Sequence, residues 1–377
     1  MSARTFREIR IGKTTVIIDA HFHIFPPLGR ATVEEDPLQP LRMKFWQCHM
    51  RDSTRFRRKA DDAPVPEPFL QWDSDDIKEM PEVNFRMADF GRAEITVDGV
   101  DYYTQAYPPS LINCEAPPER MIGEMDLVGV DMGVLQHDHI YGALNEYYGE
   151  QMRRFPNRFI GLAQVREWEA DSPAEHERLE QAVREHGLMG LYFSVEPFAL
   201  SNYADHLDDA KFEPLWEKVR ELGIPVWWYL HSRQRDRLGG FMEHVAELDR
   251  WAEAHPDIPA LLTHGIDTFS MRRGEERYEI PDALMTLLKR PNMHVEVLFC
   301  AFWPEYPFPG AQEKIRELRE EIGVQKLMWG TDMPYCSGSW CTYRQAIDYI
   351  RVHCEFLSED EKALILGGNA ARMFNLL

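Results

Sequence analysis

Cysteine is scarce in this chain. Its 377 residues include six cysteines, which are too few and too scattered for the disulfide scaffold of a small secreted domain. The first ten residues are charged and carry no apolar stretch of the kind that a secretory signal needs. We therefore expect a protein of the reducing cytoplasm, with Cys336 and Cys341 as buried free thiols rather than metal ligands.

Long apolar runs and basic charge are also lacking. No stretch approaches the roughly 18 apolar residues that a membrane-spanning helix requires. The 63 acidic residues outnumber the 42 lysines and arginines, and the resulting net charge of −21 disfavours nucleic acid or an anionic membrane as a partner. With 44% hydrophobic residues the chain can bury a large core without disulfides. A small molecule is the expected partner.

Short apolar runs bounded by polar residues recur along the chain. Eight of them have the length of strands: residues 16–20, 132–136, 159–165, 189–194, 225–230, 259–263, 294–299 and 326–330. Helix-like segments separate the later runs, at residues 212–222, 240–255, 282–290 and 311–322. Eight alternating units in a chain of this length favour an α/β fold of the (β/α)8 TIM-barrel type over a doubly wound sheet.

Residues that can bind metals follow four of these runs. They are His21 with His23, then His231, His264 and Asp332. In a barrel the carboxyl ends of all strands meet at one mouth, so we expect these side chains to converge. His21 and His23, two residues apart, would share one face of a strand and supply half of a metal site. The spacing alone is weak evidence, because 14 histidines give roughly 0.5 such pairs by chance, and two histidines in a polar loop would look the same.

The order of these residues resembles that of the amidohydrolase superfamily. Residues 155–163, the turn 330–334 and the ending 364–376 are similar to the amidohydrolase-related family that includes aminocarboxymuconate-semialdehyde decarboxylase. The resemblance covers residues 15–27 and 117–377. It implies one divalent metal, most often zinc with manganese as the alternative, bound by His21, His23, His231 and Asp332. It also implies that His264 transfers protons, with Asp332 as the second catalytic group, and that a homodimer is the oligomer to look for.

Alternatives remain for individual residues. His264 could be a fourth nitrogen ligand instead of an acid or base, and Asp332 could cap the segment that follows it. Two-metal relatives usually carry a lysine after the fourth strand, but residues 190–197 contain none, so we expect a single metal. Glu196 in that segment is expected to be a solvated loop carboxylate rather than part of the site.

Candidate substrate-binding residues are less certain. The second histidine pair, His137 and His139, follows the second strand, and His139 is expected either to line the substrate pocket or to lie in a polar loop. Arg166 and Arg233 could hold a substrate carboxylate. Trp303 belongs to an aromatic segment that is either a pocket rim or a packed loop.

A long insertion interrupts the barrel pattern after the first strand, at about residues 27–116. It includes an expected hairpin over residues 93–103 that turns at Asp98-Gly99. Loops at the carboxyl ends of barrel strands build the active site, so the insertion is expected to form a lid or a dimer contact within a single domain over residues 1–377.

Two reactions fit the same five residues. In hydrolysis, water activated by the metal attacks a carbonyl carbon or an equivalent carbon, and in decarboxylation His264 protonates the carbon that loses CO₂. The paired histidines on the first strand favour hydrolysis, because several decarboxylating relatives replace the first one by glutamate. A catalytically inactive barrel would have lost ligands, and none is missing here.

Overall fold

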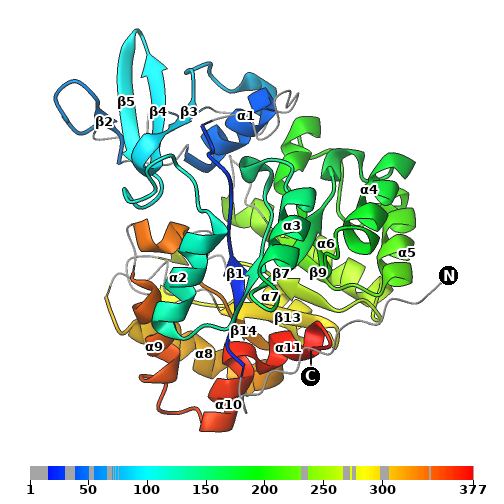
Figure 1. The fold of residues 1–377 in the computed structure, drawn as a ribbon. Coiled ribbons are helices and arrows are strands. Elements are labelled where there is room, and N and C mark those ends of the chain that lie inside the picture. The colour runs from blue at the N-terminus through cyan, green and yellow to red at the C-terminus, as the bar shows by residue number, and fades with distance from the viewer. Residues whose placement is uncertain are drawn as a thin grey trace.

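Figure 1 shows the computed structural model of the chain, which describes residues 16–29, 39–50, 55–65, 70, 72, 74, 76–230, 237–265, 272–273, 277–297, 305–338 and 341–376. Eight parallel strands form one sheet in the order β1-β6-β7-β8-β9-β10-β13-β14. Their bounds are β1 (Ile18–Phe22), β6 (Met132–Leu135), β7 (Phe159–Gln164), β8 (Gly190–Ser194), β9 (Val226–Tyr229), β10 (Ala260–Leu262), β13 (Met293–Val297) and β14 (Leu327–Trp329). All eight predicted strands are therefore present, with ends that differ from the prediction by at most two residues.

The first and last strands of this order meet. Phe22 forms a parallel bridge with Met333, and His23 N donates to the Met333 carbonyl at 2.9 Å. Asp332 N donates to the His21 carbonyl, also at 2.9 Å. These bonds bring the sheet round into a barrel, so the predicted (β/α)8 fold is confirmed.

Helices surround the sheet. They are α2 (Pro118–Val128), α3 (Asn145–Arg154), α4 (Pro173–Arg184), α5 (Glu213–Leu222), α6 (Arg237–Ala254), α7 (Asp282–Lys289), α8 (Pro309–Ile322), α9 (Tyr343–Arg351), α10 (Glu359–Ala363) and α11 (Asn369–Met373). The four helices predicted from the sequence correspond to α5, α6, α7 and α8. Within the described part of the chain, no helix has both the length and the apolar character needed to cross a membrane.

The barrel interior is closed at its amino-terminal end by α11. Asn369 donates to the carbonyl of Leu327, the first residue of β14, at 2.8 Å. Phe374, just after α11, stacks on Trp227 of β9 with ring centroids 5.0 Å apart. Apolar side chains fill the space between this plug and the mouth: Ile18, Ala20, Met132, Val134, Ile160, Leu162, Tyr192, Leu261 and Met328. The opposite end of the strands is left to carry the polar residues.

The insertion between β1 and α2 adds a helix and a small antiparallel sheet, drawn in blue and cyan above the barrel in Figure 1. These elements are α1 (Gln39–Met50) and the strands β2 (Arg57–Arg58), β3 (Arg86–Ala88), β4 (Arg92–Val97) and β5 (Val100–Gln105), in the order β2-β5-β4-β3. The predicted hairpin is β4–β5, and its turn residues Asp98 and Gly99 have φ angles of 51° and 77°, as a two-residue turn of this kind requires. The α1 helix is docked on the barrel by Trp46, whose indole N–H donates to the Ile140 carbonyl at 2.8 Å. A two-stranded ribbon, β11 (Arg272–Arg273) and β12 (Arg277–Tyr278), lies between β10 and α7.

Candidate metal centre

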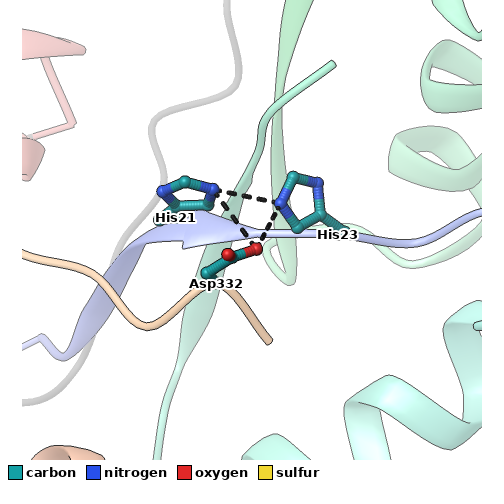
Figure 2. A group of neighbouring side chains, drawn as sticks. All are labelled: His21, His23 and Asp332. Carbon is teal, nitrogen blue, oxygen red and sulfur yellow. Dashed lines mark hydrogen bonds and ion pairs between the residues drawn. The ribbon is translucent and has the colours of Figure 1, made fainter. Parts of the chain in front are cut away.

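His21 lies within β1 and His23 just beyond its end. Ile18 and Ala20 point into the barrel core, so strict alternation would turn His21 away from the interior. The pairing of β1 with β6 shifts register in this part of the strand, and such irregularities re-aim side chains. Both imidazoles face the carboxylate of Asp332, which follows β14 (Figure 2).

His21, His23 and Asp332 form a compact triad. The two Nε2 atoms are 3.0 Å apart, His23 Nε2 is 3.0 Å from Asp332 Oδ1, and His21 Nε2 is 3.6 Å from the same oxygen (Figure 2). All three residues are buried, with exposed fractions of 1%, 4% and 9%. The structure therefore brings together three of the four predicted metal ligands from opposite ends of the sequence.

The second nitrogen of each imidazole fixes its orientation. His21 Nδ1 lies 3.1 Å from the Glu296 carboxylate, and His23 Nδ1 lies 3.2 Å from the Gln136 carbonyl oxygen. Both partners only accept hydrogen bonds, so each Nδ1 carries a proton and each Nε2 is turned toward the triad. Burial disfavours a charged imidazole, but Glu296 and Asp332 outweigh it and raise the pKa of His21 to about 9.

Without a proton or a cation between them, the two Nε2 atoms and the Asp332 oxygen would be three acceptors facing one another. The triad therefore needs one positive charge among these atoms. A proton on His21 can supply it, and so can a divalent metal ion that displaces this proton. Burial lowers the pKa of His23, which keeps that imidazole neutral, as metal coordination requires. Two imidazoles and one carboxylate with oriented Nδ1–H groups are a donor set that suits zinc or manganese. The residues present therefore fit a divalent metal.

Glu296 of β13 holds the groups around the triad in place. Its carboxylate accepts from the His264 backbone N–H at 2.6 Å and lies 2.7 Å from the Thr263 hydroxyl, in addition to binding His21. A side chain at Gly330, the residue after β14, would place its Cβ 1.8 Å from Glu296 Oε1, so this position must be glycine to make room for the carboxylate. Glu296 lies within the strand expected over residues 294–299, but the sequence predicted no role for it. The available signal was a charged residue inside an apolar strand.

Asp19 was missed altogether. Its buried carboxylate accepts hydrogen bonds from the Thr331 backbone at 3.0 Å, the Thr331 hydroxyl at 2.5 Å, the Tyr343 hydroxyl at 2.9 Å and the His21 backbone at 3.1 Å. Asp19 thus joins β1 to the segment after β14, immediately before Asp332. Asp332 itself has a φ angle of 59°, in the left-handed region, so its backbone needs such support.

His264 stands beside the triad rather than in it. Its ring centroid is 4.7 Å from that of His21 and 4.6 Å from that of Tyr229. Its backbone has a φ angle of 56°, and at the following Gly265 a Cβ would lie 2.1 Å from the Glu296 carbonyl oxygen. His264 Nδ1 is buried and has no hydrogen-bond partner among the described residues. Burial and the neighbouring His21 lower the pKa of His264, so its imidazole is neutral and able to accept a proton.

Two of the predicted substrate residues line one pocket. His139 and Arg166 contribute to a pocket of about 300 Å³, together with Trp168 and with Arg42 and Phe45 of α1. The His139 ring lies 5.0 Å from the Trp168 ring. None of the triad residues lines this pocket, so the structure places His139 and Arg166 together but apart from the candidate metal centre.

The expectation of a solvated Glu196 is wrong. Glu196 is 2% exposed, and its carboxylate lies 3.0 Å from His49 Nδ1 of α1. The physical reason is the insertion, because α1 covers the loop after β8 and the barrel pattern alone could not predict that cover. The predicted residues His231, Arg233 and Trp303 lie outside the described residues.

The fold and the triad define a class of protein, a TIM barrel with a histidine- and aspartate-lined candidate metal centre at its mouth. The chain belongs to the amidohydrolase family, which matches residues 18–376. It is therefore an enzyme of the metal-dependent hydrolase and decarboxylase type that this family comprises.

Individual relatives are distant. A 4-sulfomuconolactone hydrolase from Hydrogenophaga intermedia is 24% identical over 282 residues, which are 72% of this chain and 84% of that protein. The crystal structure of 2,6-dihydroxybenzoate decarboxylase from Rhizobium is 16% identical with a TM-score of 0.52, and the match covers 70% of this chain and 90% of that one. A dihydroxybenzoic acid decarboxylase from Polaromonas sp. JS666, solved with bound manganese and an inhibitor, is 17% identical with the same TM-score and covers 70% and 87%. At these identities the two structures support the fold alone.

Proposed function

We propose that this protein is a hydrolase that uses one divalent metal to cleave a C–N, C–O or C–C bond in a small carboxylated or aromatic molecule. His21, His23 and Asp332 would hold the metal with His231, and zinc is the proposed ion, with manganese as the alternative. The observation that carries the proposal is the convergence of three buried ligand atoms within 3.0 to 3.6 Å of one another. The name of the Hydrogenophaga relative, a lactone hydrolase, supports hydrolysis as the reaction.

A divalent metal bound here would polarise a substrate carbonyl and make water more acidic. The protein residues would divide the remaining tasks. Glu296 keeps His21 oriented, and the neutral His264 accepts the proton released by the attacking water. Asp332 is the second candidate for this proton. We propose Arg166, Arg233, His139 and Trp303 as substrate-binding residues, of which His139 and Arg166 face the pocket beside α1.

Decarboxylation of an aromatic or enol carboxylate is the second candidate. The Rhizobium and Polaromonas structures with this fold are decarboxylases by name. In that reaction His264 would give a proton to the substrate carbon rather than accept one from water. The same candidate site serves both reactions. The two are distinguished by whether the oxygen of water enters the product.

The metal is tested first. We expect purified protein to contain zinc or manganese and the Asp332→Ala variant to contain one equivalent less per chain, measured by plasma mass spectrometry. His231→Ala should lose the same equivalent. The Glu247→Gln variant, which alters a buried carboxylate paired with His206 at 2.7 Å, is the control and should keep its metal. A folded wild-type protein that refuses added zinc and manganese would contradict the proposal.

The reaction is tested next, with a panel of small lactones and aromatic carboxylates in heavy-oxygen water. Hydrolysis incorporates the label into the product. Unlabelled product with release of CO₂ would instead establish the decarboxylase.

A further inference from the structure

Two tyrosine hydroxyls meet beside the triad, one from the insertion and one from the barrel. The Tyr107 hydroxyl donates to the Tyr141 hydroxyl at 2.9 Å. Tyr107 follows β5 in the insertion, and Tyr141 lies in the loop after β6. The Tyr141 ring stacks on the imidazole of His23, with centroids 4.8 Å apart and an angle of 28° between the planes. The pair therefore connects the insertion to a candidate metal ligand.

Local hydrogen bonds fix the position of both tyrosines. Tyr107 N donates to the Gly91 carbonyl at 2.9 Å, and the Tyr107 carbonyl accepts from the Gln105 side chain at 2.7 Å. Gly91 has a φ angle of 68°, and a Cβ there would lie 2.6 Å from the Tyr107 carbonyl oxygen, so this approach requires glycine. Tyr141 N donates to the Asp138 carbonyl at 3.0 Å. Both phenols are therefore held in place before any ligand arrives.

Aromatic side chains enclose the hydroxyl pair. The Phe25 ring lies 5.3 Å from the Tyr107 ring and 5.0 Å from the Tyr141 ring. The Trp46 ring of α1 lies 5.8 Å and 6.3 Å from the same two rings. Tyr107 and Tyr141 are accordingly buried, with exposed fractions of 0% and 4%. Hydrogen-bond partners for these hydroxyls have to come from the protein, from an enclosed water or from a ligand.

The hydroxyl pair has one hydrogen more than the protein uses. Each tyrosine hydroxyl carries one hydrogen, and the bond between the two takes up one of them. Among the described residues no acceptor takes the other, which belongs to Tyr141 because Tyr107 is the donor within the pair. A buried donor without a partner costs free energy. A ligand-binding or catalytic role explains why such a group is present in a native structure.

The candidate metal ligand Asp332 acts on both hydroxyls. Burial and the Asp332 carboxylate raise the pKa of Tyr141. Burial, the neighbouring Tyr141 and the Asp332 carboxylate raise the pKa of Tyr107. Both phenols therefore stay protonated at neutral pH and act as donors within the electrostatic field of the triad.

We propose that Tyr141 donates its remaining hydrogen to a substrate oxygen at the triad, the oxygen on which negative charge develops, and that Tyr107 is a positioning residue that orients and polarises the Tyr141 hydroxyl. The inference rests on the proposed function, because it needs a substrate at the triad. It favours substrates with a carbonyl or carboxylate oxygen, which a preorganised donor in a buried site stabilises best. The insertion would then contribute a side chain to the chemistry of the site.

The first test needs no ligand and is made by differential scanning calorimetry without metal. The double variant Tyr107→Phe/Tyr141→Phe removes both hydroxyls, and with them the hydrogen that lacks an acceptor. We expect its melting temperature to equal or exceed that of the wild type. Tyr349→Phe is the matched control, because it removes a buried hydroxyl that donates to the Val297 carbonyl at 3.1 Å, and it should melt below the wild type. A double variant that also melts below the wild type would overturn the proposal, because the hydrogen would then have an acceptor within the protein.

The second test measures binding of benzoate, an aromatic carboxylate, to the zinc-loaded protein by isothermal titration calorimetry. We expect Tyr141→Phe to weaken binding by roughly 10- to 100-fold, as for a hydrogen bond to a charged group, and Tyr349→Phe to leave it unchanged. Equal affinities in the wild type and Tyr141→Phe, or no binding to the wild type, would overturn the proposal.

The role of Tyr107 is tested with the same probe. Tyr107→Phe should weaken benzoate binding less than Tyr141→Phe does, because the donor itself remains. Tyr107→3-fluorotyrosine places a more acidic phenol behind Tyr141 and should strengthen binding. A purely structural role would leave the affinity insensitive to the acidity of this phenol.

Failure of the proposed function would look different. A wild type that takes up no zinc refutes the proposed metal, and both tests of the tyrosine pair are then decided on the metal-free protein. If the wild type and Tyr141→Phe bind zinc alike and bind benzoate alike, the metal stands and only the role of Tyr141 is refuted.

Discussion

Glu296 shows how much of the candidate site depends on a residue that does not face the triad's centre. Its carboxylate binds the His21 Nδ1–H and the His264 backbone N–H, so it orients both the ligand and the proton acceptor. It also requires glycine at position 330. Residues in such supporting positions are usually needed for full metal affinity, because they fix the tautomer and direction of the ligand.

We predict that Glu296→Gln weakens zinc binding by about 10- to 100-fold without unfolding the barrel. The amide can keep an acceptor oxygen in the place of Oε2, but it loses the negative charge beside His21, and its NH₂ group would stand 3.1 Å from His21 Nδ1 in place of Oε1. Zinc affinity is measured by competition with a chromophoric chelator. The control is Glu247→Gln, and equal affinities in the two variants would show that Glu296 has no supporting role.

At the scale of the elements, the closure of the barrel depends on β1 meeting β14. Asp19 accepts four hydrogen bonds across this junction, and three of them come from Thr331 and Tyr343. The bonds hold the turn that carries Asp332 against the strand that carries His21. A carboxylate is suited to this task because both of its oxygens only accept.

We predict that Asp19→Asn lowers the free energy of unfolding by roughly 2–4 kcal/mol, because the amide NH₂ group is forced against hydrogen-bond donors in a buried site. The measurement is urea unfolding followed by circular dichroism. Asp131→Asn is the matched control: its carboxylate accepts from the Ile17 backbone at 3.0 Å, and an amide oxygen can replace it there. A similar loss in both variants would contradict the role assigned to Asp19.

The strands could be predicted closely from the sequence, whereas the supporting contacts could not. Apolar runs of five to seven residues indicate buried parallel strands, and residues that follow such strands must gather at one end. Nothing in the local pattern shows that β1 shifts register to turn His21 inward. Nor does it show that Glu296 reaches back from a neighbouring strand. These depend on pairings between segments more than 100 residues apart.

The insertion was the least predictable part for the same reason. Its hairpin was recognisable, because Asp98-Gly99 has the conformational freedom that a tight turn needs. The docking of α1 could not be recognised, and neither could the burial of Glu196, which depends on it. A helix that packs on a loop from another part of the chain leaves no periodic signal at the loop.

At the scale of the whole molecule, the structure shows how the few cysteines of the chain are packed. Of the six cysteines, the structure describes five, Cys48, Cys114, Cys336, Cys341 and Cys354, and all are free and buried. Burial raises the pKa of the Cys114 and Cys354 thiols to about 12, so thiolate, the reactive form, is rare at neutral pH. The prediction of free thiols is thus confirmed for the described cysteines.

We predict that the folded protein exposes few reactive thiols. In a titration with Ellman's reagent at pH 7.5, at most one thiol, Cys300, which lies outside the described residues, should react within minutes. The other five should react only as the barrel opens, at a rate set by unfolding rather than by reagent concentration. In denaturant without reductant all six should react at once. Rapid reaction of two or more thiols in the folded state would contradict the packing described here, and fewer than six in denaturant would reveal a disulfide that this packing does not allow for.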